Sequence, residues 1–83
     1  MPAAGGRLRA CILVRAKSGR AKQVADRLTK MEGVTRAFPV FGAVDVIARA
    51  QVASLEKLVR LVSRIDHAPD VLGSETLPEL EVE

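Results

Sequence analysis

Apolar and polar side chains alternate along two segments of the chain, residues 8–16 and 44–52. In both segments the even positions are apolar, whereas five of the eight odd positions between them are polar. A period of two residues is typical of a β-strand, because successive side chains point to opposite faces of a sheet. Each segment is therefore predicted to form a strand with one apolar face.

Two other segments have the periodicity of amphipathic helices. Ser18 and Ser54 precede them and are predicted to be the N-caps, because a serine hydroxyl can accept a free N–H of the first turn. Gly33 is predicted to stop the first helix in a left-handed conformation. The apolar helical positions are Ala21, Val24, Ala25 and Leu28 in the first segment, and Leu55, Leu58, Val59, Leu61, Val62 and Ile65 in the second.

Two shorter segments, residues 34–41 and 71–77, are also predicted to be strands. Pro39 lies within the first of them and has no N–H to donate, so this strand is expected at an edge of the sheet. Gly42 and Ala43 are suited to a tight hairpin turn into the next strand.

The two halves of the chain repeat each other. The apolar positions of the first helix recur 37 residues later in the second, and Val34 recurs as Val71. The order of elements is therefore βαβ twice. Right-handed crossovers and the edge position of Pro39 are satisfied by one antiparallel sheet in the order 4-1-3-2, with both helices on one face. The predicted fold is ferredoxin-like α+β, βαββαβ.

The helices of this fold leave one face of the sheet uncovered. Cys11, Leu13 and Ile47 are predicted to form the centre of that face, and each large aliphatic side chain left in water forfeits about 1.5–3 kcal/mol of burial. The same face of a second copy would cover them, which predicts a homodimer. A tolerated exposed patch is the alternative, because protein surfaces are commonly more than half apolar. The predicted rim consists of Arg9, Arg15, Asp45, Arg49 and Gln51.

Chain length, cysteine count and net charge limit the number of domains and the classes of function that the protein can have. Eighty-three residues, 48% of them apolar, suffice for one small domain, so residues 1–7 are interpreted as a flexible tail and residues 8–83 as a single domain. One cysteine excludes a disulfide within a monomer, which favours association as the source of stability.

The net charge of +3 is spread along the chain, and this is weak evidence for nucleic-acid binding. No apolar run approaches the roughly 20 residues that span a bilayer, so a cytoplasmic protein without a membrane contact is expected.

No group of residues indicates catalysis or metal binding. Nothing in the sequence places Cys11 and His67 as a nucleophilic pair. Asp66, His67 and Asp70 are interpreted as a polar turn. The chain has no Tyr or Trp on which RNA bases could stack. We therefore predict no cofactor, no metal and no enzymatic activity.

The ordered set of segments resembles the C-terminal effector-binding domain, called the RAM domain, of the Lrp/AsnC transcription regulators. Each motif is short, and only the ordered set, across about residues 8–80, is specific. Full-length members begin with a helix-turn-helix, for which there is no room before Leu8. The resemblance thus implies a stand-alone version that does not bind specific DNA sequences by itself. The motifs are Gly33-Val34, the turn from Gly42 to Asp45, and the hydroxyl residues Ser74 and Thr76.

The resemblance also implies an effector site, since an amino acid commonly binds between dimers of the family. Asp45 would bind the ammonium group, and the two hydroxyls would bind the carboxylate. A structural turn aspartate and ordinary strand residues are the alternative. Val44 stands where the family favours tyrosine, so the sequence does not identify the ligand. The residues implied are Gly42, Ala43, Val44, Asp45, Ser74 and Thr76.

Three functions remain open at this point. The first is a regulatory domain that forms dimers and higher homo-oligomers, and whose amino-acid effector shifts the populations of these assemblies. The second is an accessory subunit that joins full-length Lrp/AsnC regulators without a ligand of its own. The third is a small enzyme of the dimeric α+β barrel type, which would need a polar catalytic group between sheet and helices.

Overall fold

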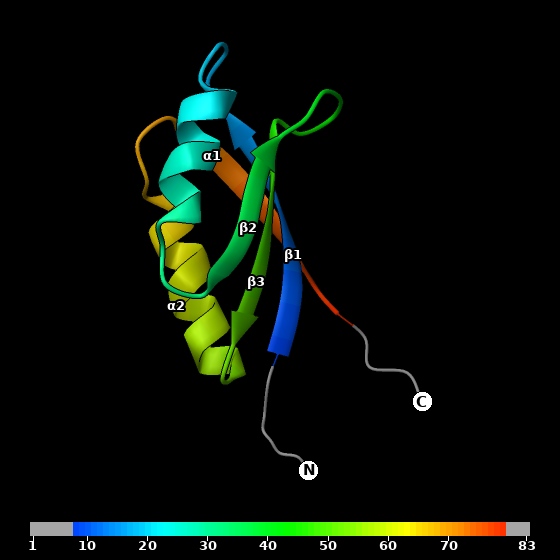
Figure 1. Cartoon of the computed structure of the whole chain (residues 1–83), viewed down its shortest axis with the longest axis vertical. Coiled ribbons are helices and arrows are strands. Elements are labelled where there is room, and N and C mark those ends of the chain that lie inside the picture. Colours follow the sequence, from blue (N-terminus) through cyan, green and yellow to red (C-terminus); the bar gives the residue numbers. More distant parts are fainter. Residues whose placement is uncertain (1–7, 80–83) are drawn as a thin grey trace.

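The computed structural model describes residues 8–79. The predicted tail, residues 1–7, and the end of the predicted domain, residues 80–83, lie outside the described residues. The strands form one antiparallel sheet in the order β2-β3-β1-β4, and both helices pack on the same face (Figure 1). This confirms the predicted ferredoxin-like α+β fold. The elements are β1 (Leu8–Ala16), α1 (Ala21–Thr29), β2 (Val34–Pro39), β3 (Val46–Val52), α2 (Leu55–Asp66) and β4 (Val71–Pro78).

The hydrophobic core lies between the sheet and the two helices. The even positions of β1 and β3 face it, and the register places Ile12 opposite Ala48 and Val14 opposite Val46. These side chains are small or branched, which lets the helices approach the sheet closely. Helix α1 contributes Val24, Ala25 and Leu28 to the core, and α2 contributes Leu58, Leu61 and Ile65.

Helix α1 begins and ends at other residues than predicted. Its N-cap is Arg20, and no side chain caps it. Ser18 lies instead in a turn closed by the hydrogen bond from the Arg20 N–H to the Lys17 carbonyl (3.0 Å). The prediction for Ser18 was wrong because this turn passes through Gly19, at φ +80°, before the helix starts. Gly33 is left-handed as predicted, at φ +99°, but the helix ends earlier, at Thr29.

The connection between β2 and β3 is a loop and not a tight hairpin turn. Strand β2 ends at Pro39 and β3 begins at Val46, so residues 40–45 form a loop that projects from one end of the sheet (Figure 1). The Val40 N–H donates to the Asp45 carbonyl (2.9 Å), which closes the base of the loop. Strand β2 is at the edge of the sheet, which confirms the expectation from Pro39.

Each outer strand contains one bulged residue. In β2, Val34 lies opposite Ala50 and Arg36 opposite Arg49, so Thr35 is the extra residue. In β4, Val71 lies opposite Ala16 and Gly73 opposite Arg15, so the extra residue is Leu72. On both sides of each bulge, the side chains of the outer strand point to the same faces of the sheet as those of their partners on the central strand.

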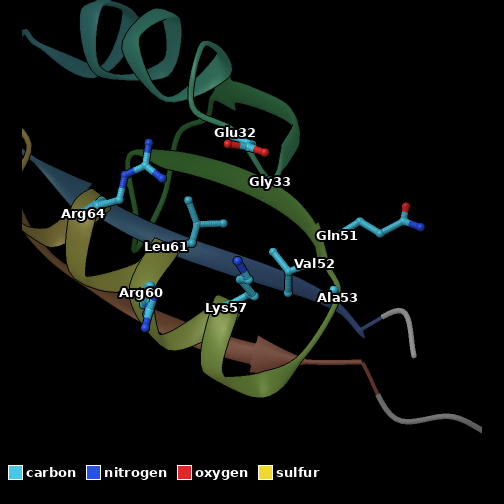
Figure 2. A pocket seen from close by; sticks show the side chains of 9 residues that line it. All are labelled: Glu32, Gly33, Gln51, Val52, Ala53, Lys57, Arg60, Leu61 and Arg64. Atoms are coloured by element: carbon cyan, nitrogen blue, oxygen red, sulfur yellow. The ribbon is translucent and has the colours of Figure 1, made fainter. Parts of the chain in front are cut away.

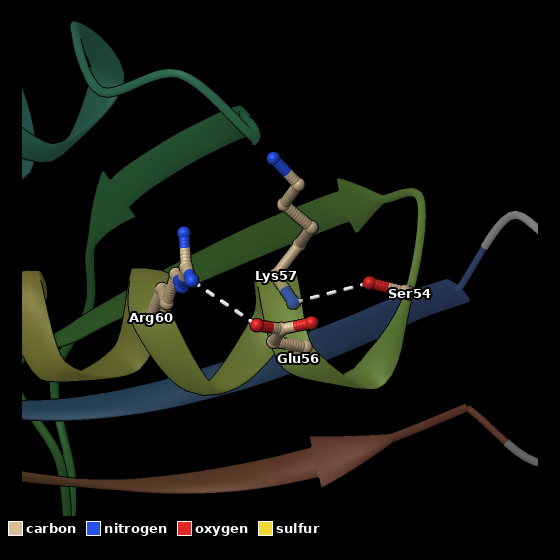
Figure 3. A network of polar contacts seen from close by, with 4 residues as sticks. All are labelled: Ser54, Glu56, Lys57 and Arg60. Carbon is tan, nitrogen blue, oxygen red and sulfur yellow. Dashed lines mark hydrogen bonds and ion pairs between the residues drawn. The ribbon is translucent and has the colours of Figure 1, made fainter.

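The two predicted N-caps can be compared directly by mutation. The Ser54 hydroxyl accepts the Lys57 backbone N–H at 3.2 Å (Figure 3). We expect Ser54→Ala to lower the free energy of unfolding by about 0.5–2 kcal/mol, because an N–H of the first turn of α2 loses its partner. Ser18→Ala is the matched control and should change it by less than about 0.5 kcal/mol. Urea denaturation measures both, and equal losses would contradict the assignment of the cap.

Candidate functional site

The predicted dimer face is a continuous surface on the side of the sheet opposite the helices. Leu13 and Ile47 lie directly opposite each other on β1 and β3, and both side chains are partly exposed. Phe38 lies opposite Ile47 on β2, and Leu77 lies opposite Cys11 on β4 with 44% of its surface exposed. We call these five residues the apolar centre of the open face. Phe38 and Leu77 were not predicted, although their places follow once the register is known.

Arginine side chains surround the apolar centre. Arg9 forms an ion pair with Glu79 across the end of β4 (2.8 Å). The Arg36 guanidinium lies over the Phe38 ring, 4.8 Å from its centroid, which is a cation–π geometry. Arg15 lies across Gly73, where a Cβ would come within 2.9 Å of its Nη2 atom. The open face thus has an apolar middle and a charged rim, in which Glu75 and Glu79 accompany the arginines.

Asp45 connects the β2–β3 loop to β1. Its carboxylate Oδ2 accepts the Ala16 backbone N–H (2.8 Å), and its own N–H donates to the Val14 carbonyl (2.9 Å). The Asp45 carboxylate therefore bonds the backbone of a neighbouring strand and not the backbone of its own loop. In the same loop Gly42 and Ala43 are exposed, whereas Val44 is half-buried.

Ser74 and Thr76 lie on the helix-covered face of β4. The register places Ser74 opposite Val14 and Thr76 opposite Ile12, and both of these partners point into the core. The Ser74 hydroxyl donates to Oδ1 of Asp66 at the end of α2 (2.6 Å). The structure therefore brings Asp45 and Ser74 to the two sides of the same end of β1, while each side chain is bonded to another part of the protein.

Asp66, His67 and Asp70 lie at the C-terminal end of α2 or shortly after it. His67 is the C-cap, and its ring Nδ1 lies 2.7 Å from the Ser63 carbonyl oxygen. Asp66 accepts the bond from Ser74, and Asp70 faces Arg20 at 3.8 Å. Within residues 8–79, no three His, Cys, Asp or Glu side chains are grouped to hold a metal ion. No helix in the same range is long and apolar enough to cross a membrane.

A groove that the sequence analysis did not predict lies between α2, the turn before β2 and the end of β3 (Figure 2). Its volume is about 560 Å³. Helix α2 contributes Lys57, Arg60 and Arg64 to its wall, and the opposite wall contains Glu32 and Gln51. The signal in the sequence was the spacing of three basic residues along one side of the helix. We call this feature the α2 groove.

A ferredoxin-like sheet with one helix-covered face and one open face with an apolar centre defines a small α+β domain. Comparison with known protein families identifies the family to which this domain belongs. The family described as the Lrp/AsnC ligand-binding domain matches residues 9–82. The chain belongs to this family, which confirms the resemblance that its ordered motifs indicated.

Solved structures of similar fold agree with this assignment. The protein TTHA0845 from Thermus thermophilus is 22% identical, with a TM-score of 0.84 over 92% of this chain and 96% of its own. Escherichia coli AsnC is 19% identical, with a TM-score of 0.82 over 99% of this chain and 59% of its own. The leucine response regulatory protein of Mycobacterium tuberculosis is 22% identical, with a TM-score of 0.77 over 90% of this chain and 51% of its own. No curated protein sequence matches the chain.

Proposed function

We propose that the protein is a non-enzymatic regulatory domain that binds a small effector of the amino-acid class at an interface between subunits and thereby modulates transcription in the cytoplasm. The observation that carries this proposal is the match of the ligand-binding family over residues 9–82. A similar structure is that of a leucine response regulatory protein, which supports the amino-acid class. An effector that binds one assembly more tightly than another shifts the population toward it.

The proposed assembly begins with a homodimer through the open face. The apolar centre lies in the middle of that face, and charged side chains surround it, which is the usual anatomy of a protein interface. A two-fold axis through the face would bring Leu13 and Ile47 against the same residues of a second copy. Higher homo-oligomers would then place the projecting β2–β3 loops near a neighbouring dimer, where the effector is proposed to bind.

Asp45 is the proposed partner of the effector's ammonium group. Its bond to the Ala16 N–H uses Oδ2, and a carboxylate has further lone pairs to accept from a ligand. Ser74 would have to release Asp66 before its hydroxyl could donate to a ligand carboxylate. Thr76 is therefore the better proposed donor of the two. Gly42, Ala43 and Val44 would form the loop wall of this site.

Calorimetry with the common amino acids tests the proposed effector site. We expect Asp45→Asn to weaken the bound amino acid roughly ten- to hundredfold, because a charge-assisted hydrogen bond contributes about 1.5–3 kcal/mol. The fold should persist, since the amide oxygen can still accept the Ala16 N–H. Thr76→Val should cause a smaller loss. His67→Ala, which lies outside the proposed site, should leave affinity unchanged. No heat from any amino acid at millimolar concentration would contradict the proposal.

An accessory subunit is the second candidate function. The whole chain superimposes on 59% of AsnC, so a domain of a longer regulator has the same shape. The open face would then pair with the equivalent face of a full-length Lrp/AsnC regulator, without a ligand of its own. Native mass spectrometry of the two proteins mixed would show heterodimers in this case, together with the absence of a calorimetric signal.

A further inference from the structure

The α2 groove has walls that the fold holds in place. On one side, the Gln51 N–H donates to the Gly33 carbonyl (2.8 Å), which fixes the turn before β2 to the end of β3. On the other side, α2 is capped by Ser54 and held down by Leu61, which is 2% exposed. A Cβ at Gly33 would lie 3.2 Å from both Leu61 and Val52, so the turn packs tightly on the floor of the groove. The groove is therefore preformed, which lowers the cost of binding.

The basic side chains that line the groove occupy positions of α2 at which positive charge destabilises the helix. Lys57 lies in the first turn of the helix, where the macrodipole disfavours a cation. Arg60 and Arg64 are four residues apart, a spacing at which like charges destabilise a helix. Glu56 compensates only Arg60, by an ion pair of 3.0 Å (Figure 3). Among residues 8–79, Lys57 and Arg64 have no carboxylate within ion-pair distance.

The side chains of Lys57 and Arg64 face the same space as the apolar floor of the groove. Figure 2 shows Lys57, Leu61 and Arg64 directed from α2 toward the opposite strand and turn. Leu61 and Val52 supply an apolar floor between the charged side chains. An apolar surface flanked by a few polar groups at this volume is typical of a site for a small molecule. Glu32 is the single acidic residue of the lining, so the groove keeps an excess of positive charge.

We propose that the α2 groove binds a small organic anion with a short apolar chain, within one subunit and separately from the proposed effector site. The carboxylate of such a ligand would lie between Lys57 and Arg64, and its chain would lie on Val52 and Leu61. The anion would also supply the negative charge that this side of α2 lacks. The excess of cations favours a net anion over a zwitterion of the same shape.

Backbone-amide NMR of the full chain at low ionic strength tests this site. The probe is 4-methyl-2-oxopentanoate, and leucine, acetate and inorganic phosphate are compared with it. We expect saturable shifts at Gly33, Gln51 and Lys57, with half-saturation at about 1 mM or below. Leucine should bind more weakly because of its ammonium group, and acetate and phosphate more weakly because they lack the chain.

Variants decide whether the groove binds the probe. Lys57→Gln and Arg64→Gln should each weaken it about tenfold, because each removes one charged donor. Lys22→Gln, on the exposed side of α1, removes the same charge elsewhere and should leave affinity within about twofold. An equal loss in Lys22→Gln, the absence of saturable shifts, or equal binding of acetate, phosphate or leucine would overturn the proposal. Asp45→Asn should leave the shifts unchanged, so failure of the effector site and failure of the groove are separable.

Discussion

Replacing Leu13 with aspartate is expected to convert the proposed dimer into a monomer. Leu13 lies in the middle of the open face, directly opposite Ile47 and next to two other strands of the sheet. In a two-fold dimer, both copies of the aspartate would be buried close together in the apolar centre of the open face. Burying a charge in an apolar interface costs several kcal/mol, and this cost opposes association. Sedimentation velocity at micromolar concentration would measure the change.

The matched control for this experiment is Leu55→Asp. Leu55 is 64% exposed at the start of α2, on the opposite side of the sheet from the apolar centre. An acidic residue in the first turn of a helix is favourable, so this variant should remain dimeric and folded. A stable dimer of Leu13→Asp would show that the subunits associate through another surface. Dissociation of both variants would point to a general effect of charge.

The second large effect is expected from Ile12→Ala. Ile12 is fully buried on β1, a central strand, between Ala48 and Thr76. Truncating a buried isoleucine to alanine costs about 2–5 kcal/mol, because packing contacts are lost and a cavity remains. A domain of this size then loses at least about 10 °C in melting temperature. Differential scanning calorimetry at one fixed protein concentration would measure it, since the proposed subunit association would make the transition concentration-dependent.

Ile12→Val is the control for the core prediction. It removes one methylene from the same site and should cost about 0.5–1.5 kcal/mol. A loss for Ile12→Ala as small as that for Ile12→Val would show that the helices collapse onto the shortened side chain. The two experiments are independent, because Leu13 and Ile12 point to opposite faces of the same strand.

Strong periodicity explains which elements could be predicted from sequence. The bounds of β1 follow from apolar residues at every even position from Leu8 to Ala16, and those of α2 follow from an apolar stripe with Ser54 before it. The predicted bounds of β2 and β3 were too long because Val40, Phe41 and Val44 are residue types typical of strands, although they lie in the loop between the two strands. Ser18 was misassigned because a serine before an apolar helix has the same local pattern in a cap and in a turn.

The geometry of the site depends on contacts that a linear pattern does not contain. The bond from the Ala16 N–H to Asp45 joins residues 29 positions apart, and it exists because β3 lies beside β1. The bond from Ser74 to Asp66 depends on which face of β4 the helix covers. The resemblance implied that both side chains bind a ligand, and a structural role for each was the alternative. The register shows that each already has a partner within the protein.

The bulges and prolines of the outer strands limit how copies of this protein can join. Both β2 and β4 contain a bulged residue, and each strand ends at a proline that has no N–H to donate. Irregular edges of this kind are poor templates for adding another strand. Concentrated solutions should therefore resist growth into fibrils by the addition of strands at β2 or β4.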